Sequence, residues 1–398
     1  MTDDAIPFDP DDPSLWMLGS DVDWIRGDYV ARLEHPGQFA RQHPWLVANR
    51  LFAESMVRSN PKAVTAILGA LLSWRVCTIG QLHAGLSAYP VPDFARDEPN
   101  LYGALVRLGA INIGFDQRER LEGVTVPQVW ASMGNTASYI RDTLACFESG
   151  AWLRMALTSS RLSAMRVHAR HNTYASHCGL MLARDARTKL VGGDGWGGFR
   201  LIDPRAVSEA GLNRVSSTDI VALTGGNVLA GIEVQAGANN MDKKLSNWAR
   251  LLANSPMGRR GLVCVWLLIK DATRGEYPYL NPVLRKTSDM GEMMVGYPSV
   301  AQRMGVATWE EWFDHGHPTE GFGSYTDLLG AKRSIFDDEW SRYTPSVRPL
   351  DTVEQWGWQV MRDALKREWG VNADGWRMPD AYRGGFYGFA KGGSDGID

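Results

Sequence analysis

The chain has 398 residues, of which 44% are hydrophobic and 22% carry a charge. This length favours more than one domain, and the composition is that of a globular protein with a sizeable core. The formal net charge of -3 excludes a polycation that binds nucleic acid through bulk charge. Any contact with nucleic acid must therefore come from local basic patches.

Cysteine usage and hydropathy indicate where the protein resides. The four cysteines are far apart in the sequence and form no CxxC pair, so neither a disulfide framework nor a zinc site is expected. The acidic, proline-rich start "MTDDAIPFDPDDP" differs from a signal peptide. The longest apolar run, at 262–269, is too short to cross a bilayer. We therefore expect a reduced, cytoplasmic protein without a membrane partner.

The region 61–118 is predicted to contain three short helices and a strand. The apolar stretch 63–75 forms the first helix, and Thr78 and Gln81 stand at capping-box spacing at the start of the second. The third helix ends at Gly109 and leads into a short strand. This order is typical of a winged helix, a helix-turn-helix variant, and a plain three-helix bundle is the alternative.

The third helix of this region, near 99–107, is the predicted recognition helix. We expect Asn100, Tyr102 and Arg107 to lie on its exposed side, because the leucines of the segment occupy the opposite side. These three side chains are the predicted DNA contacts.

After residue 166 the sequence predicts alternating helices and strands. The expected elements are, in chain order, a helix at 168–184, strands at 199–203, 219–224 and 228–235, a helix at 241–254 and a buried strand at 261–269. A GxGxxG pattern precedes the first of these strands, but a dinucleotide site needs a strand before this motif and a helix after it. The region is therefore predicted to be a core with the order αβββαβ.

These patterns predict a multidomain α/β (α+β) protein with five regions. They are an N-terminal extension at 1–60, a winged helix-turn-helix domain at 61–118, a helical connector at 119–165, the α/β core at 166–275, and a mainly helical C-terminal extension at 276–398 with a flexible glycine-rich tail.

The hairpin "DIVALTGGNVLAGIEVQ" places polar residues at the open end of two apolar strands. Side chains alternate along a strand, so Glu233 and Gln235 share one face. A two-residue turn would pair Asp219 with Ile232, on the other face. A three-residue loop at 225–227 pairs Asp219 with Glu233, and its glycine and asparagine residues tolerate the backbone that such loops need.

Two facing carboxylates repel each other unless a cation lies between them, and Mg²⁺ is the expected ion. Lys244 shares a helical stripe with Trp248 and Leu252, so we expect it to point toward the sheet. Two plainer interpretations stay open: Asp219 caps a strand end, and Lys244 lies on a solvated helix face.

The order of these elements, with Asp219 on one strand and Glu233-Val234-Gln235 on the next, resembles the PD-(D/E)XK nuclease core. This resemblance implies that Asp219, Glu233 and the Val234 carbonyl hold Mg²⁺ or Mn²⁺. In that family a lysine usually stands two residues after the glutamate, where this chain has Gln235. The resemblance therefore assigns the orientation of the attacking water to Gln235 or Lys244.

A wider resemblance covers roughly residues 61–270. A winged helix, a helix with His171 and His177, and a core that contains "KLSNW" together resemble the replication-relaxation group of plasmid and phage proteins. The two histidines are six residues apart and do not share a helix face, so they are not expected to bind a metal together. The resemblance implies DNA as a partner, in a bacterial or phage-infected cell.

Three functions are consistent with this sequence. The first is a DNA-binding protein with a divalent-metal-dependent endonuclease-like domain that hydrolyses phosphodiester bonds. The second is a non-catalytic DNA-binding replication or regulatory factor on a degenerate nuclease scaffold. The third is a phage or plasmid assembly or interaction protein, and association with a second copy or another phage or plasmid protein stays open. The net charge favours the latter two over a nuclease that grips long duplex DNA.

Two further segments contain residue types that can bind a metal ion or nucleic acid. The segment "DHGHP", with Asp314, His315 and His317, is interpreted as an ordinary polar loop because it offers no second pair of metal ligands. The tail at 383–391 mixes basic and aromatic residues that suit stacking on single-stranded nucleic acid. An unstructured terminus or a docking peptide is an equal alternative for the tail.

Overall fold

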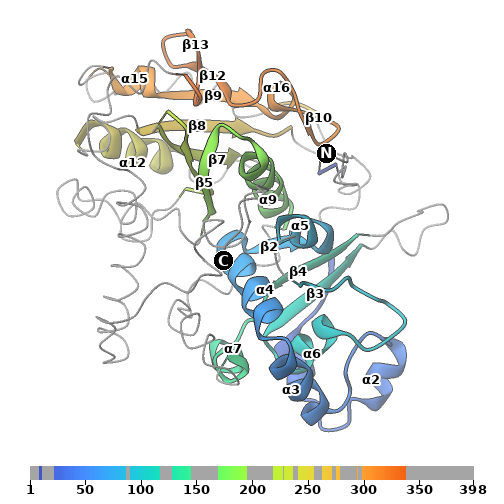
Figure 1. The fold of residues 1–398 in the computed structure, drawn as a ribbon. Helices are drawn as coiled ribbons and strands as arrows, with labels where there is room; N and C mark the ends of the chain where they lie inside the picture. The colour runs from blue at the N-terminus through green and yellow to red at the C-terminus, as the bar shows by residue number, and fades with distance from the viewer. Residues whose placement is uncertain are drawn as a thin grey trace, which may run out of the picture. The chain divides into compact units, whose positions relative to one another are not determined.

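The structure is a computed structural model of mixed α/β architecture with several sheets (Figure 1). It describes residues 9–10, 22–86, 90–116, 128–144, 169–194, 218–226, 228–235, 241–254, 262–270, 275–277, 294 and 298–337. Within these ranges, no helix is long and apolar enough to cross a membrane.

The chain forms two compact units. Unit 1 comprises residues 1–8, 18–176 and 361–398, and unit 2 comprises residues 9–17 and 177–360. The division after Ser176 falls inside helix α9 (Ala169–Arg184). This helix confirms the prediction for residues 168–184.

Unit 1 contains a four-stranded antiparallel sheet with the strand order β1-β3-β4-β2. Its described elements are β1 (Val22–Ile25), α1 (Gly27–Ala31), α2 (Gly37–Gln42), α3 (Arg50–Ser59), α4 (Pro61–Trp74), β2 (Val76–Thr78), α5 (Ile79–Gly85), α6 (Leu101–Arg107), β3 (Ile111–Asp116), β4 (Val129–Met133), α7 (Ala137–Leu144) and the first half of α9.

Local sequence signals determine several of these boundaries. Pro61 lies in the first turn of α4, where a missing N–H costs no hydrogen bond. Thr78 and Gln81 form the predicted capping box at the start of α5, with both reciprocal bonds present. Gly109 adopts a φ of 76°, a left-handed conformation that ends the helical segment before β3, as predicted.

The sheet of unit 1 is larger than the sequence predicts. Strand β1 lies in the predicted N-terminal extension, and β4 lies in the segment expected to be a helical connector. Strand β3 pairs with both of them, through Ile113 opposite Ile25 and opposite Ala131. Every residue of β4 is buried, so the strand lacks the alternating pattern that would identify it from sequence.

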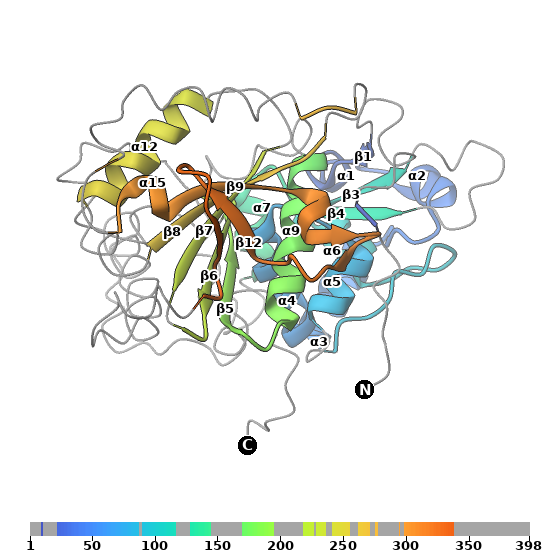
Figure 2. The ribbon, with the colours of Figure 1, turned by 90° about the horizontal axis from the view of Figure 1, so that it is seen from above.

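Unit 2 is built on a seven-stranded sheet with the order β13-β12-β9-β8-β7-β6-β5 (Figure 2). Strands β7, β8 and β9 are parallel neighbours, and the outer pairs are antiparallel. Its described elements are the second half of α9, β5 (Thr188–Gly193), β6 (Ile220–Thr224), β7 (Leu229–Gln235), α12 (Met241–Asn254), β8 (Leu262–Leu268), α15 (Val300–Arg303), β9 (Met304–Thr308), α16 (Trp309–Trp312), β10 (Phe313–Asp314), β11 (His317–Pro318), β12 (Ser324–Asp327) and β13 (Lys332–Ser334).

The described elements of the core follow the predicted order of helix, three strands, helix and strand. The first strand is β5, which the sequence analysis missed, and the strand predicted at 199–203 lies outside the described residues. The second and third strands and helix α12 lie within one residue of their predicted bounds.

The prediction of a mainly helical C-terminal extension is wrong for residues 300–337. Strands β9, β12 and β13 extend the sheet of the core, so this segment belongs to the same unit. The physical reason is the edge of β8, a fully buried strand whose backbone groups need a hydrogen-bonding partner on each side. Strand β9 supplies that partner in parallel register, with Val265 opposite Gly305. The rest of this predicted extension after residue 337, with its glycine-rich tail, lies outside the described residues.

Candidate functional site at the end of strands β6 and β7

The β6–β7 hairpin has the register that the sequence analysis predicts. Ile220 pairs with Ile232, and the N–H of Thr224 donates to the carbonyl of Val228 at 2.9 Å. These pairs enclose a loop of three residues, of which residue 227 lies outside the described part of the chain. Continued outward by one residue, the same register places Asp219 opposite Glu233.

Asp219 is fixed at the open end of the hairpin by the neighbouring strand. Its Oδ2 accepts a hydrogen bond from the N–H of Val234 at 2.9 Å. The N–H and C=O of one strand residue point toward the same neighbour, so the Val234 carbonyl lies on the side of the strand that faces Asp219. The hydroxyl of Thr218 donates to the carbonyl of Ile232 at 2.9 Å and anchors the start of β6.

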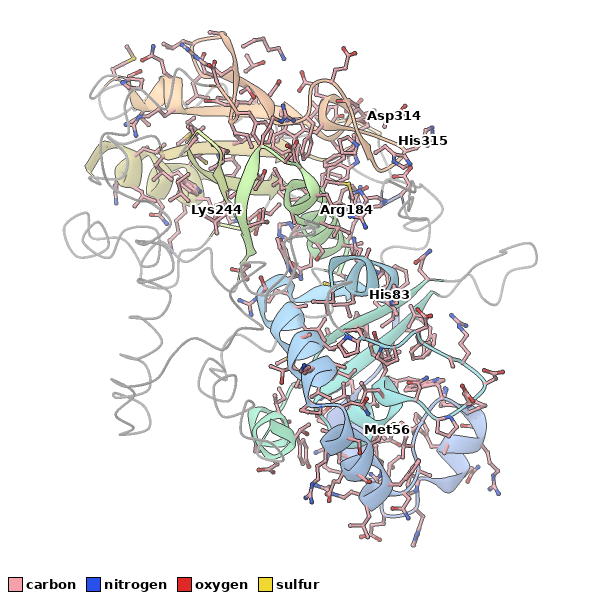
Figure 3. The ribbon with its side chains drawn as sticks, viewed as in Figure 1. Met56, His83, Arg184, Lys244, Asp314 and His315 are labelled. Atoms are coloured by element: carbon pink, nitrogen blue, oxygen red, sulfur yellow. The ribbon has the colours of Figure 1, made fainter. Side chains whose placement is uncertain are left out.

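Glu233 is 1% exposed, and protein groups bind both of its carboxylate oxygens. Oε1 accepts from the indole N–H of Trp248 at 2.6 Å, and Oε2 accepts from Nζ of Lys244 at 3.0 Å. Both donors lie on α12, and Lys244 points toward the sheet as predicted (Figure 3).

Gly231 explains how α12 comes so close to β7. A Cβ atom at this position would overlap the six-membered ring of Trp248. The absent side chain therefore allows the indole to lie over the strand, two residues before Glu233 on the same face. This contact brings the indole N–H within hydrogen-bonding distance of the carboxylate.

The electrostatics of the site depend on burial and on three carboxylates. The pKa of Glu233 is raised to about 7, because burial and the nearby charge of Asp219 together outweigh the opposing effects of Lys244 and Trp248. The pKa of Lys244 is raised above its ordinary value, chiefly by Asp219, then by Glu233 and by Asp194 at the end of β5. Lys244 thus stays protonated at neutral pH, and one ammonium group faces three carboxyl groups.

Gln235 continues the strand beyond this cluster. It is 6% exposed, and its backbone carbonyl accepts from the N–H of Ile269 at 3.1 Å. Its side chain is on the same face of β7 as that of Glu233, because the two residues are two positions apart. The predicted residues Asp219, Glu233, Gln235 and Lys244 are thus gathered at one end of the sheet.

Sequence reasoning did not assign four residues to this cluster, namely Gly231, Trp248, Asp194 and Trp266. Gly231 and Trp248 form the contact that orients Glu233, and the spacing of Trp248 four residues after Lys244 was a usable signal. Asp194 belongs to the glycine-rich segment with the GxGxxG pattern, and no spacing within that segment relates it to Lys244. Trp266 pairs with Glu233 in the β7–β8 register, and its buried indole N–H has no hydrogen-bond partner among the described residues.

The oxygen atoms at this end of the sheet are of the type that Mg²⁺ or Mn²⁺ prefers. Asp219 and Glu233 supply carboxylates, and Val234 supplies a backbone carbonyl. Among the described residues, no group of three or more His, Cys, Asp or Glu side chains is arranged to hold a metal ion. The two carboxylates and one carbonyl fit a divalent cation by their chemistry, while the oxygens of Glu233 are engaged by Lys244 and Trp248.

The exposure predicted for two residues of α6 is wrong. Tyr102 is 0% exposed and Arg107 is 6% exposed. The guanidinium of Arg107 donates to the carbonyls of Ala48 at 3.0 Å and Val30 at 2.7 Å, so it joins α6 to the chain around α1 and α3. Asn100 is half-buried and caps α6, because its Oδ1 accepts from the N–H of the third helical residue at 3.0 Å.

The cause of this error lies in residues 22–60, which fold against α6. A Cβ atom at Gly103 would overlap the carbonyl of Trp45, so backbone from this segment lies directly on the helix. All seven residues of α6 are buried. The face that seemed free in the sequence of 61–118 is therefore covered by residues 22–60, which belong to the predicted N-terminal extension.

His177 of α9 is buried against the "DHGHP" segment, which forms a tight turn. His177 is fully buried, its Nε2 lies 2.7 Å from the carbonyl of Gly316, and burial lowers its pKa to about 4. Asp314 pairs with His317 across a two-residue turn. His315 and Gly316 have φ angles of 44° and 78°, as such tight turns require. The interpretation as an ordinary polar turn fits this geometry.

Comparison with known proteins adds no relative. No protein-family model, no curated protein and no solved structure matches this chain.

Proposed function

We propose that this chain is a DNA-binding protein whose unit 2 carries a divalent-metal-dependent nuclease-like site of the PD-(D/E)XK type. The observation that carries the proposal is the β6–β7 register, which places Asp219 opposite Glu233 and beside the Val234 backbone. The order of α9, β5, β6, β7, α12 and β8 supports it. Lys244 adds a charged amine on the helix that follows the two strands.

The DNA-binding part of the proposal is supported by the order of elements in unit 1. Helix α4, strand β2, helices α5 and α6, and strands β3 and β4 follow one another as in a winged helix. Because Tyr102 and Arg107 are buried, we place the DNA contacts of this unit on other surfaces than α6.

The chemistry proposed for unit 2 divides between a metal site, a positive charge and a group that orients water. Asp219, Glu233 and the Val234 carbonyl would hold Mg²⁺ or Mn²⁺. When bound, such an ion sharpens a water nucleophile and offsets negative charge on a phosphodiester. The amine of Lys244 stays protonated and neutralises charge that develops on the phosphate oxygens. Gln235 or Lys244 orients the attacking water by hydrogen bonding.

A second candidate function keeps the scaffold without the chemistry. Glu233 is 1% exposed, and both of its oxygens accept from protein donors. A carboxylate satisfied in this way stabilises α12 on the sheet without a metal ion. This observation favours a non-catalytic DNA-binding replication or regulatory factor.

Nicking of supercoiled plasmid DNA in Mg²⁺ and Mn²⁺ tests the proposal. The wild-type chain should nick the plasmid, and Glu233→Gln should abolish nicking because it removes one of the two metal-binding charges. Glu311→Gln is the matched control. Glu311 lies away from the site, where its Oε1 forms an exposed ion pair with Nζ of Lys332 at 2.9 Å. If the wild type binds the same plasmid but nicks it neither in Mg²⁺ nor in Mn²⁺, the result would favour the second candidate.

A further inference from the structure

Unit 1 contains a cavity of about 710 Å³ that no part of the proposed function uses. It lies where β1, α1, α2, the end of β3 and the neighbouring loops meet, and Figure 2 shows these elements close together. Its volume is within the range of sites that hold small organic ligands, about 300–1,000 Å³. Two kinds of side chain, aromatic and basic, line most of it.

Aromatic rings form one continuous part of the lining. Tyr29 packs edge-on against Phe39 with ring centroids 6.3 Å apart, and Phe39 lies 4.5 Å from the ring of His43. His43 lies 5.9 Å from Trp45, which in turn lies 5.7 Å from Phe115. Tyr29 is 53% exposed, which leaves part of its ring open to a ligand. Exposed and half-buried rings in a cavity offer faces on which a flat ligand stacks.

Arginines form the second part of the lining. Arg26 and Arg32 are exposed, and both donate to the buried carboxylate of Asp28, at 2.7 Å and 3.4 Å. One carboxylate therefore holds two guanidinium groups at the cavity. The guanidinium of Arg96 lies 5.3 Å from the centre of the Phe115 ring. A guanidinium group has several N–H donors in a planar fork, which can donate to two phosphate oxygens at once.

The balance of charge at the cavity is positive. Three guanidinium groups are opposed by the buried Asp28 and by Asp23, which also lines the cavity. His43 adds a ring rather than a charge, because burial lowers its pKa. A net positive lining of this kind attracts an anion, while the rings beside it provide apolar contact.

We infer that this cavity binds a nucleotide, with the base stacked on the exposed Tyr29 ring and the half-buried Phe39 ring, and the phosphate held by Arg26, Arg32 and Arg96. Neither part of the lining alone selects this ligand: an inorganic anion leaves the rings unused, and a neutral aromatic molecule leaves the arginines unused. Stacking surfaces beside basic groups are the arrangement with which proteins hold unpaired nucleotides.

The nucleotide has two sources, a free mononucleotide or an unpaired residue of a single DNA strand. The second source rests on the proposed DNA-binding function and the first does not. Neither needs the metal site of unit 2, so the absence of nicking by the wild type would leave the inference unaffected. The two proposals therefore fail separately.

Fluorescence of 2-aminopurine tests the inference on the full-length chain, because this base is quenched when it stacks on an aromatic ring. One arm uses 2-aminopurine deoxyribonucleoside monophosphate, and the other uses a short oligothymidylate that contains one 2-aminopurine. Quenching in either arm is expected, and the arm that responds at the lower protein concentration identifies the source. Inorganic phosphate should compete far more weakly than thymidine monophosphate.

Three variants locate the binding. Phe39→Ala and Tyr29→Ala should each weaken binding by roughly tenfold, the usual effect of removing one stacking ring. Arg32→Gln should weaken it and reduce its dependence on salt. Tyr29 is sufficiently exposed that its replacement keeps the fold intact, which circular dichroism verifies. The matched controls are Phe52→Ala, a 54% exposed ring on α3, and Arg58→Gln, an exposed charge on the same helix.

Three outcomes would overturn the inference. They are the absence of quenching in both arms, equal competition by phosphate and thymidine monophosphate, and binding by Tyr29→Ala and Arg32→Gln that is as tight as that of the wild type. Quenching that Tyr29→Ala and Arg32→Gln lose, and that Phe52→Ala and Arg58→Gln keep, would support it.

Discussion

Glu233 in unit 2 and Arg107 in unit 1 are both buried charged residues, yet their partners differ in kind. Arg107 donates to backbone carbonyls, which do not titrate and have fixed positions. Glu233 accepts from Lys244 and lies in the field of Asp219, and both of these groups are ionisable. A buried charge held by backbone stabilises one conformation, whereas a buried charge held by other ionisable groups responds to protons and cations. This difference marks the Glu233 cluster as the functional candidate.

The largest effect on stability is expected at Arg107, whose buried guanidinium donates to backbone carbonyls in fixed positions. Arg107→Met should lower the free energy of unfolding by about 3 to 5 kcal/mol, because it leaves buried carbonyls without their donor. Urea denaturation of wild type and variant measures this change. Arg58→Met, at an exposed position, should stay within about 0.5 kcal/mol of the wild type. A small effect at Arg107 would show that its bonds are not structural and would weaken the contrast with Glu233.

The next effect is the pH dependence that Glu233 contributes. Its pKa is about 7 in the folded chain, against an ordinary value near 4.5, so the folded state binds the proton more tightly. Stability should therefore fall as pH rises from about 4.5 to 7, by up to about 3 kcal/mol, and then level off. The raised pKa of Lys244 also contributes stability. This contribution is lost only at alkaline pH, where the amine deprotonates.

Unfolding measured at steps between pH 4.5 and 8 tests this expectation against Glu233→Gln. The variant has no proton to lose at this position, so its profile should be flatter over the same window. Superimposable profiles of the two proteins would show that Glu233 does not titrate in this range.

A smaller effect is expected at Gly231, which allows Trp248 to reach Glu233. Gly231→Ala should displace the indole and lower the free energy of unfolding by about 1 to 3 kcal/mol. Gly37→Ala is the control, because a Cβ there meets no atom within 4 Å, and it should change stability by less than about 1 kcal/mol. Thermal unfolding of the two variants compares them. An effect at Gly231 no greater than at Gly37 would contradict the close contact of α12 with β7.

The smallest effect is expected at the exposed ion pair of Glu311 with Lys332. Both side chains contact water, so Glu311→Gln should cost less than about 1 kcal/mol. The loss should shrink further in high salt, which screens exposed charges. If Glu311→Gln lowered the free energy of unfolding by about 3 kcal/mol, the amount expected from the titration of Glu233, the difference in burial would not distinguish the two carboxylates.

Local signals in the sequence predict much of the core of unit 2. The apolar stripe of α12 gives its bounds, and the three-residue loop gives the β6–β7 register that places Asp219 opposite Glu233. Both depend on residues close together in the chain. The predicted approach of Lys244 to the sheet is also correct, because its stripe includes the buried Trp248.

Contacts between distant segments explain what the sequence analysis missed. Arg107 looked like an exposed charge because its acceptors come from residues 30 and 48, outside the region interpreted as a domain. Strand β9 is short, and it is a strand because it completes the edge of β8. The role of Gly231 depends on where α12 crosses the sheet, which no local pattern states.

The central claim is that the buried charge of Glu233 is linked to a divalent cation, and a thermal-shift series in Mg²⁺ and Mn²⁺ tests it most directly. A cation that binds only the folded chain raises its melting temperature by mass action. The account predicts that wild type and Glu311→Gln melt at higher temperature as the metal concentration rises to millimolar levels, and that Glu233→Gln does not. Identical metal responses of wild type and Glu233→Gln, or no response in either, would contradict it.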